Sequence, residues 1–211
     1  MKTLLARILC SAAQAMWDKD TTLGKYTSET EQHELNLAFH YACELRDWFP
    51  WLDCDFDVSK VACNYERPDI ILHRRTTHAL NFLVIEVKRE KYRRAVSLDL
   101  KQIRERWFEN YYRYIYGAAV ILEDNKPMFE VQVLSREEKN AEPISLSHAN
   151  MGKPLHIPNF SNGRYEQCLQ EIERTTAILH AGNGKADALG RVMYALYDLT
   201  PEETKIVKGD K

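Results

Sequence analysis

The sequence lacks the features of several specialised protein classes. It has no run of about 18 apolar residues, the length that a membrane-spanning helix needs, so we expect no membrane partner. It has no internal repeat and no low-complexity tract, and its 45% hydrophobic and 28% charged residues are ordinary for a folded protein. No glycine-rich phosphate loop and no local Ser-His-Asp or Cys-His signature is present. The ordinary composition and the absence of repeats and low-complexity tracts exclude disordered, fibrous and collagen-like chains.

Cysteine follows no recognisable pattern. The five residues, Cys10, Cys43, Cys54, Cys63 and Cys168, are odd in number, and no two of them form a C-x-x-C pair. This spacing indicates neither a disulfide framework nor a zinc site. We therefore expect reduced thiols and a cytoplasmic protein.

The first 17 residues superficially resemble a signal peptide, but Arg7 interrupts the apolar stretch. Leu5, Ile8 and Leu9 instead recur at helical spacing. We expect an amphipathic helix here.

Net charge is nearly absent, because 29 basic and 31 acidic residues leave −2. The charge is uneven, however. Residues 74–113 contain eleven Lys or Arg and five Asp or Glu, a local excess of +6 that leaves −8 for the rest of the chain. A basic segment on an acidic body predicts a local surface for a polyanion.

The spacing of apolar residues predicts a series of helices and strands. Helices are expected over residues 3–16, 28–48, 97–114, 163–180 and 184–197, with a short last helix capped at Thr200-Pro201. Strands are expected over residues 54–58, 61–65, 70–72, 82–87, 118–122 and 128–134. Ser28 and Glu31 fit a capping box, and we expect Gly117 to end the helix over 97–114.

This order of elements predicts a single α/β domain. We expect residues 1–134 to form a mixed central sheet flanked by helices. Residues 135–162 have three prolines and no clear period, which indicates a long connection. Residues 163–211 are expected to form a C-terminal helical extension.

Three charged residues stand out in the predicted sheet. Asp69 begins one strand, and Glu86 and Lys88 lie two apart on the next, so both side chains point to the same face. If the strands are antiparallel neighbours, Asp69 lies near Glu86. Buried charges are costly unless they are paired or metal-bound. Carboxylate oxygens suit Mg²⁺, and a metal ion with a nearby Lys supplies the groups that phosphodiester hydrolysis requires.

The phrases around these residues, RPDIIL and LVIEVK, resemble the PD-(D/E)XK nuclease superfamily. Pro68-Asp69 matches the PD, and Glu86-Val87-Lys88 matches the (D/E)-X-K. The resemblance covers residues 28–134 and implies a restriction-endonuclease-like fold with an αβββαβ core. It also implies an endonuclease that hydrolyses DNA to 5′-phosphate and 3′-hydroxyl products with Mg²⁺, for which Mn²⁺ can substitute. Asp69, Glu86 and the Val87 carbonyl would hold the metal, and Lys88 would position the attacking water.

The resemblance also indicates residues outside the motif. The family commonly carries a further acidic residue on the helix before the first strand, and Glu34 is the candidate. On the helix after Lys88, Lys101 and then Gln102 are candidates for phosphate contacts. For all three, an ordinary solvated helix position is the alternative. The basic residues around the motif are candidates for contacts with the DNA backbone: Arg74, Arg75, Arg89, Lys91, Arg93 and Arg94.

The tail, RVMYALYDLTPEETKIV, is similar to the ending of restriction-modification methyltransferases and their target-recognition regions. The matching residues are Val192, Tyr194, Leu196, Tyr197, Leu199, Thr200, Glu202, Glu203, Ile206 and Val207. No N-P-P-Y motif and no glycine-rich cofactor loop accompanies them, so the tail implies a restriction or defence context and not methylation. Amphipathic helix packing is the alternative.

Two other function classes stay open at this point. A nuclease-like fold without turnover could serve as a nucleic-acid- or protein-binding module. An assembly subunit could use the tail helices as its interface, and the chain could form a homodimer.

Overall fold

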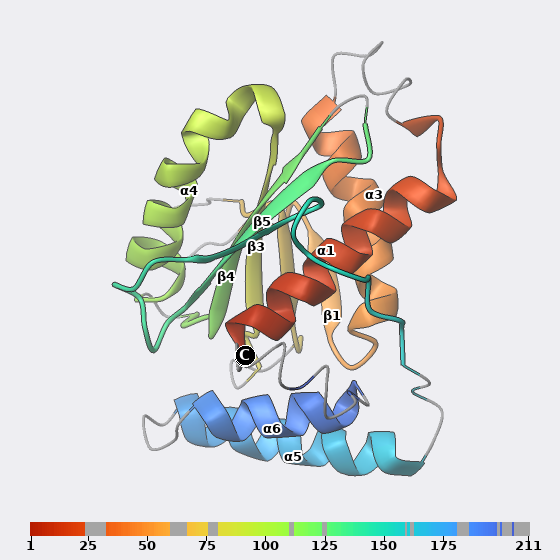
Figure 1. Cartoon of the computed structure of the whole chain (residues 1–211). Helices are drawn as coiled ribbons and strands as arrows, with labels where there is room; N and C mark the ends of the chain where they lie inside the picture. The colour runs from red at the N-terminus through yellow and green to blue at the C-terminus, as the bar shows by residue number, and fades with distance from the viewer. Residues whose placement is uncertain are drawn as a thin grey trace.

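Six strands form one mixed sheet at the centre of the molecule (Figure 1). The computed structural model describes residues 1–23, 33–59, 67–75, 80–109, 112–123, 126–158, 160, 163–180, 186–197, 199 and 204. In their order across the sheet, the strands are β1 (Asp53–Phe56), β2 (Ile70–His73), β3 (Leu83–Arg89), β4 (Tyr116–Leu122), β5 (Phe129–Ser135) and β6 (Ile144–Ser147). β3 and β4 are parallel, and every other neighbouring pair is antiparallel. The expected α/β class with a mixed sheet and flanking helices is confirmed.

The parallel β3–β4 pair needs a crossover connection, and this connection covers one face of the sheet. It consists of the 3₁₀-helix η2 (Glu90–Ala95), the α-helix α4 (Val96–Gln102) and the π-helical segment η3 (Ile103–Trp107). Leu100 and Ile103 belong to the same buried apolar cluster as Val84 and Ala119 of the sheet. We call this side of the sheet the α4 face.

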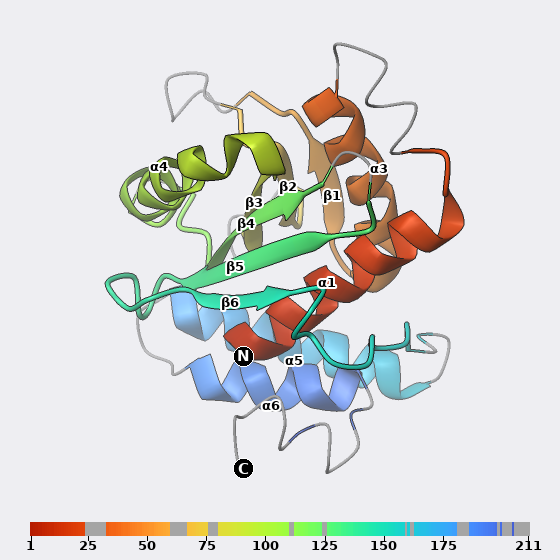
Figure 2. The same ribbon diagram turned by 45° about the horizontal axis from the view of Figure 1, so that its top comes forward.

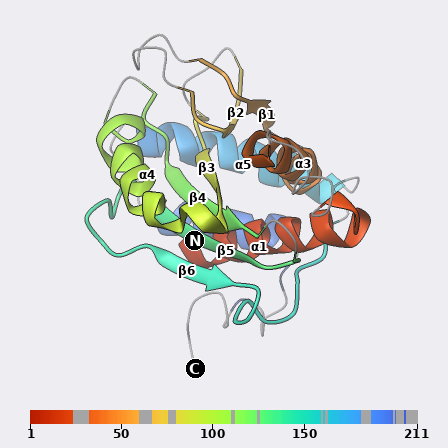
Figure 3. The same ribbon diagram turned by 90° about the horizontal axis from the view of Figure 1, so that it is seen from above.

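Two helices cover the opposite face. α1 (Lys2–Lys19) packs on β5 and β6, α3 (His33–Trp48) packs on β1 and β3, and the two helices contact each other. Strand alternation sends Ile85 and Val87 into this core and Val84 to the α4 face. Figures 2 and 3 show α4 and α1 on opposite sides of the sheet.

The C-terminal helices share the core of the sheet domain. α5 (Gly163–His180) and α6 (Ala186–Leu196) pair with each other beneath the sheet in Figure 1. Their buried residues Ile172 and Met193 belong to the same apolar cluster as α1 and α3. The Tyr197 hydroxyl donates a hydrogen bond to the Trp48 carbonyl at 2.5 Å. The described part of the expected extension is therefore packed onto residues 1–134.

The helices carry polar residues along their length. The longest, α1 and α5, each have 18 residues and include charged side chains. Within the described part of the chain, no helix combines the length and the apolar character needed to cross a membrane.

The expected helix over 97–114 is wrong at both ends. Helical structure begins with η2 at Glu90 and ends at Trp107. Gly117 does not end a helix but lies within β4, paired with Val84 and Leu134. The tyrosines after Trp107 suggested a continuing helix, but Tyr114 and Tyr116 are buried in extended chain, which aromatic residues also favour.

Other elements expected from the sequence differ less from those in the structure. The expected connection 135–162 contains the short strand β6. The buried side of α3 is formed by Leu37, Tyr41 and Leu45, and Leu35 is 48% exposed. The Ser28–Glu31 capping box, the strand over 61–65 and the Thr200-Pro201 cap lie outside the described residues.

Close packing of η3 on β4 generates a stability prediction at Gly117. A Cβ atom there would lie 2.3 Å from Ile103 Cγ2, which is too close, and 3.3 Å from the Phe108 ring, which is a tight contact. Gly117→Ala should therefore lower the free energy of unfolding by about 1–3 kcal/mol in urea titrations. Gly190→Ala in helix α6 is the matched control, because among the described residues the nearest atom to its added Cβ is Met1 Cβ, at an ordinary contact distance of 3.9 Å. The control should gain about 0.5–1 kcal/mol, and equal stability of Gly117→Ala and the wild type would contradict the prediction.

Candidate active site

The register of β2 and β3 brings Asp69 and Glu86 together. Ile70 pairs with Ile85 in this antiparallel pair, so Asp69, one residue before β2, faces Glu86 on the α4 face. Asp69 Oδ2 accepts a hydrogen bond from the Val87 N–H at 2.6 Å. The Glu86 carboxyl group in turn accepts one from the Asp69 backbone. Each of the two carboxyl groups thus accepts a hydrogen bond from the backbone of the neighbouring chain segment.

The Lys88 ammonium lies within 4.0 Å of three acidic side chains. Its Nζ is 3.2 Å from Glu34 Oε1, 3.9 Å from Asp99 Oδ2 and 4.0 Å from Asp69 Oδ2. It also donates a hydrogen bond to the Val87 carbonyl at 3.2 Å. Glu86 completes the group, since it shares the Lys88 side of β3. We call Glu34, Asp69, Glu86, Lys88 and Asp99 the Lys88 cluster.

Glu34 reaches this cluster from the other side of the sheet. It lies in the first turn of α3, whose beginning is at the end of the sheet away from α5 and α6 (Figure 1). Besides Lys88, it approaches the backbone N–H of Arg89 at 3.4 Å. The structure therefore places the partly exposed Glu34 side chain in contact with Lys88.

Asp99 is the member of the cluster that sequence reasoning missed. Among the polar residues after Lys88, Lys101 and Gln102 were the expected candidates. Lys101 instead points away from the sheet, with a 63% exposed side chain that lies 3.8 Å from Glu105, and Gln102 is partly exposed. Asp99 is only 8% exposed, and within the described residues its Oδ2 has no hydrogen-bond partner.

A sequence signal for Asp99 did exist. Positions 96, 99, 100 and 103 follow the i, i+3, i+4, i+7 spacing of one helix face, and three of them are the buried Val96, Leu100 and Ile103. An acidic residue within the apolar stripe of a helix after the E-V-K motif is the pattern that would have found it.

Burial and mutual repulsion dominate the electrostatics of the cluster. Burial raises the pKa of Asp69 to about 6, although the Val87 N–H and the Lys88 charge oppose the shift. Burial and the neighbouring Asp69 charge raise the pKa of Glu86 well above its usual range. Burial also raises the pKa of Asp99, with Lys88 opposing and Glu34 adding to the shift. These carboxyl groups hold protons more tightly than usual, first because burial disfavours their charged forms and second because neighbouring carboxylates repel one another.

The donor atoms suit a hard divalent cation. Within the described residues, no three Asp, Glu, His or Cys side chains form a ready-made metal site. Mg²⁺ does not require one, because it usually keeps several waters and binds through one or two carboxylates together with substrate phosphates. Within the described residues Asp99 Oδ2 accepts no hydrogen bond and has only the Lys88 ammonium at 3.9 Å, and this oxygen and the surplus negative charge are consistent with such an ion.

Arg74 and Arg75 are not brought to this cluster. They follow β2 at its far end, about 17 Å of extended chain from Asp69. Arg74 Nη1 pairs with Glu173 Oε1 of α5 at 2.6 Å. Arg75 forms ion pairs with Asp53 and Asp55 of β1. Both arginines therefore join elements at the end of the sheet near α5.

The basic residues after β3 separate into buried and exposed groups. Arg89 is 6% exposed and alternates to the face opposite Lys88. Lys91, Arg93 and Arg94 are exposed on η2, which follows β3 directly. Lys91 Nζ lies 4.8 Å from the centre of the Tyr92 ring. Only the exposed group is accessible to a ligand bound at the Lys88 cluster.

Comparison with family models, curated proteins and solved structures finds no match for this chain. The functional argument therefore depends on the geometry and the electrostatics of the Lys88 cluster.

The raised pKa of Asp69 generates a prediction about pH. Since the folded-state pKa of about 6 exceeds the ordinary 3.8, the folded state holds this proton more tightly than the unfolded state does. The stabilisation is complete at low pH and is lost as pH rises from 3.8 through about 6. Asp69→Asn keeps an acceptor for the Val87 N–H and cannot ionise. At pH 8 it should be more stable than the wild type in urea, by on the order of 1 kcal/mol or more, with the difference vanishing in acid.

Asp55→Asn is a control for which the expected change in stability has the opposite sign. Burial raises the pKa of Asp55, but hydrogen bonds from Arg75 and His73 outweigh it, and the net pKa is lowered. Asp55→Asn should therefore be less stable than the wild type at pH 8. Identical pH profiles for Asp69→Asn and the wild type would contradict the origin assigned to the Asp69 shift.

Proposed function

We propose that this chain is a Mg²⁺-dependent endonuclease that hydrolyses DNA phosphodiester bonds and has a restriction-endonuclease-like fold of the PD-(D/E)XK superfamily. One observation carries the proposal: Asp69 and Glu86 face each other across β2 and β3, with the Lys88 ammonium 4.0 Å from Asp69, in a buried cluster with surplus negative charge. The element order α3–β1–β2–β3–α4–β4 supports the αβββαβ core. The resemblance of the tail supports a restriction or defence context.

The residues of the cluster have distinct proposed roles. Asp69, Glu86 and the Val87 carbonyl would hold the metal ion. The chemistry that bound Mg²⁺ supplies is polarisation of the phosphodiester and a lower pKa of a coordinated water. The Lys88 ammonium orients the attacking water and stabilises the negative charge that develops on the phosphate oxygens.

Glu34 and Asp99 act on the reaction through Lys88. Both carboxylates lie within 4 Å of its Nζ, on α3 and α4 respectively, and so restrict where the ammonium points. They are positioning residues in this proposal.

Charge balance supports the need for a cation. With all groups ionised, four carboxylates and one ammonium carry a net charge of −3, and a phosphodiester adds another negative charge. Such a site repels its substrate unless protons or cations neutralise it. At neutral pH a divalent cation achieves this without protonating the carboxylates.

Lys88 gives the sharpest test of catalysis. Lys88→Met keeps much of the side-chain length and removes the ammonium, so cleavage of supercoiled plasmid with Mg²⁺ should fall by about 10²–10³-fold. Above pH 6, the melting temperature of Lys88→Met should also fall, because this substitution leaves the carboxylates of Glu34, Asp69 and Asp99 uncompensated. Lys88→Arg keeps the charge, and it should keep the fold while losing most of the cleavage.

Lys19→Met is the matched control, because Lys19 is 58% exposed at the end of α1. It should cut plasmid like the wild type. Wild-type cleavage by Lys88→Met would reject the assignment of this motif. A folded wild-type protein that binds DNA but never cuts it with Mg²⁺ or Mn²⁺ would favour the binding-module alternative.

Metal binding can be measured without activity. Titration calorimetry with Mn²⁺ should show binding to the wild type, and Asp69→Asn and Glu86→Gln should each weaken it about ten-fold or more. Because the ion competes with the proton on Asp69, whose pKa is about 6, affinity should rise as pH increases through that value. Asp55→Asn removes a carboxylate outside the cluster and should bind as the wild type does. Equal affinity of all four proteins would remove Asp69 and Glu86 from the metal site.

A further inference from the structure

A groove lies beside the Lys88 cluster on the α4 face. It has a volume of about 460 Å³, and its polar lining consists of Arg93, Arg94, Ser97, Arg104, Gln132 and Glu142. The first four come from η2, α4 and η3, and the last two from β5 and the segment before β6. We call it the α4–β5 groove. Three guanidinium groups against one carboxylate in this lining favour an anionic ligand.

The sheet register connects the groove to the Lys88 cluster. Across β3, β4 and β5, Lys88 pairs with Ile121, and Ile121 pairs with Glu130. In the neighbouring row, Glu86 pairs with Ala119, and Ala119 pairs with Gln132. Paired residues point to the same face, so both rows run across the α4 face. Two strand spacings, about 10 Å, separate Glu86 of the cluster from Gln132 of the groove lining. A chain molecule bound with one phosphate at Lys88 therefore has the groove within reach.

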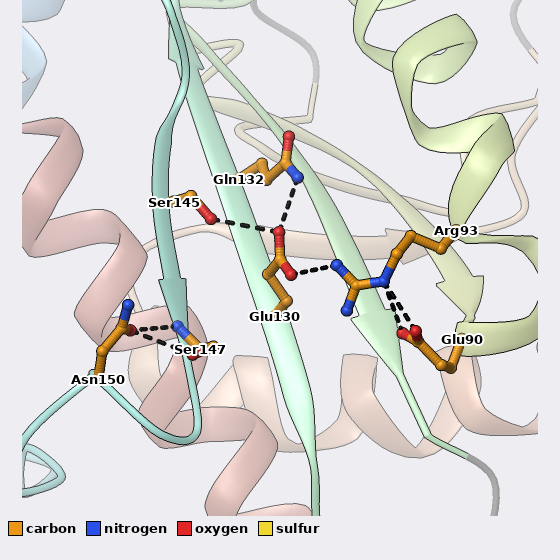
Figure 4. A network of polar contacts seen from close by, with 7 residues as sticks. All are labelled: Glu90, Arg93, Glu130, Gln132, Ser145, Ser147 and Asn150. Atoms are coloured by element: carbon orange, nitrogen blue, oxygen red, sulfur yellow. Dashed lines mark hydrogen bonds and ion pairs between the residues drawn. The ribbon is translucent and has the colours of Figure 1, made fainter.

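The arginines of the groove have different roles. Arg104 Nε donates to the Lys139 carbonyl at 2.7 Å, so it supports the wall before β6. Arg93 is oriented by Glu90 and by Glu130, and Glu130 also accepts hydrogen bonds from Gln132 and Ser145 (Figure 4). The contacts of Arg93 with Glu90 and Glu130 use Nε and Nη1, and a guanidinium has further N–H donors.

Arg94 is the guanidinium most available to a ligand. It is exposed, and within the described residues its side chain makes no ion pair or hydrogen bond. Ser97, one turn later, is also exposed and adds a hydroxyl to the same lining. An unpaired Arg beside an oriented Arg and a hydroxyl is suited to phosphate oxygens.

We infer that the α4–β5 groove binds the phosphodiester backbone of the nucleic-acid strand on one side of the scissile bond, with Arg94 as its main phosphate contact. This inference rests on the proposed nuclease function, because it names where the substrate strand of that site lies. It assigns Ser97, Arg104 and Gln132 to the substrate surface and gives Lys101 no part in it.

The test measures binding in EDTA, so that it is independent of cleavage. The probe is a fluorescein-labelled single-stranded oligodeoxynucleotide, followed by anisotropy at several salt concentrations. Arg94→Gln should lower affinity and reduce the slope of log affinity against log salt by about 0.7, the value for one phosphate contact on a single strand. Ser97→Glu places a carboxylate in the groove at an exposed position and should lower affinity as well. Arg174→Gln, the same charge change on the 72% exposed Arg174 of α5, should alter neither quantity.

The possible results separate this inference from the proposed function. Wild-type affinity and slope in both Arg94→Gln and Ser97→Glu would overturn the groove assignment, even if the protein cuts DNA. Weakened binding in both variants would support it, even if no cleavage is found. Unlabelled strand should displace the probe, whereas pyrophosphate at the same phosphate concentration should not. Equal displacement by pyrophosphate would identify a site for an isolated anion and overturn the assignment to a strand.

Discussion

The antiparallel register of β2 and β3 is the constraint on which the rest of the site depends. Side chains alternate along a strand, so a slip of one residue would turn either Asp69 or Glu86 into the apolar core between the sheet and α1 and α3. The hydrogen bond from the Val87 N–H to Asp69 Oδ2 ties the register to a carboxyl group of the site. The pairing of β2 with β3 therefore also brings the Asp69 and Glu86 carboxyl groups together.

That convergence concentrates negative charge where the sheet is buried. β3 is apolar from Leu83 to Ile85, and its polar residues lie at its end, where α3 and α4 each add one carboxylate. Burial and repulsion raise the pKa values of Asp69, Glu86 and Asp99, and a single Lys relieves part of the repulsion. The arrangement is electrostatically strained in isolation, and a divalent cation with a phosphate group would relieve it. This is the physical basis of the proposed nuclease activity.

The two ends of the sheet have different chemistry. At the end near α5 and α6, aromatic side chains close the core: Phe49, Trp51, Phe82, Tyr116 and Tyr197. Arg74 and Arg75 belong to this end and pair with acidic residues there. At the other end, charged side chains of the Lys88 cluster and the α4–β5 groove lie on one face. The tail residues Leu196 and Tyr197 are buried, so this part of the tail packs into the core of the molecule.

Local patterns in the sequence determined the features that depend on near neighbours in the chain. The period of two placed Glu86 and Lys88 on one face and is also visible in β5, because strand alternation is a local property. Continuous apolar runs located β2, β3 and β4. Only the tertiary structure decided which distant residues join them. It selected Asp99 instead of Lys101, because the face of α4 that packs on the sheet is set by the crossover. It moved Arg74 and Arg75 away, because β2 carries them to the far end. It placed Gly117 in a strand, because this residue pairs with Val84 of β3 and Leu134 of β5. Each of these outcomes depends on contacts between segments far apart in sequence, which local spacing does not encode.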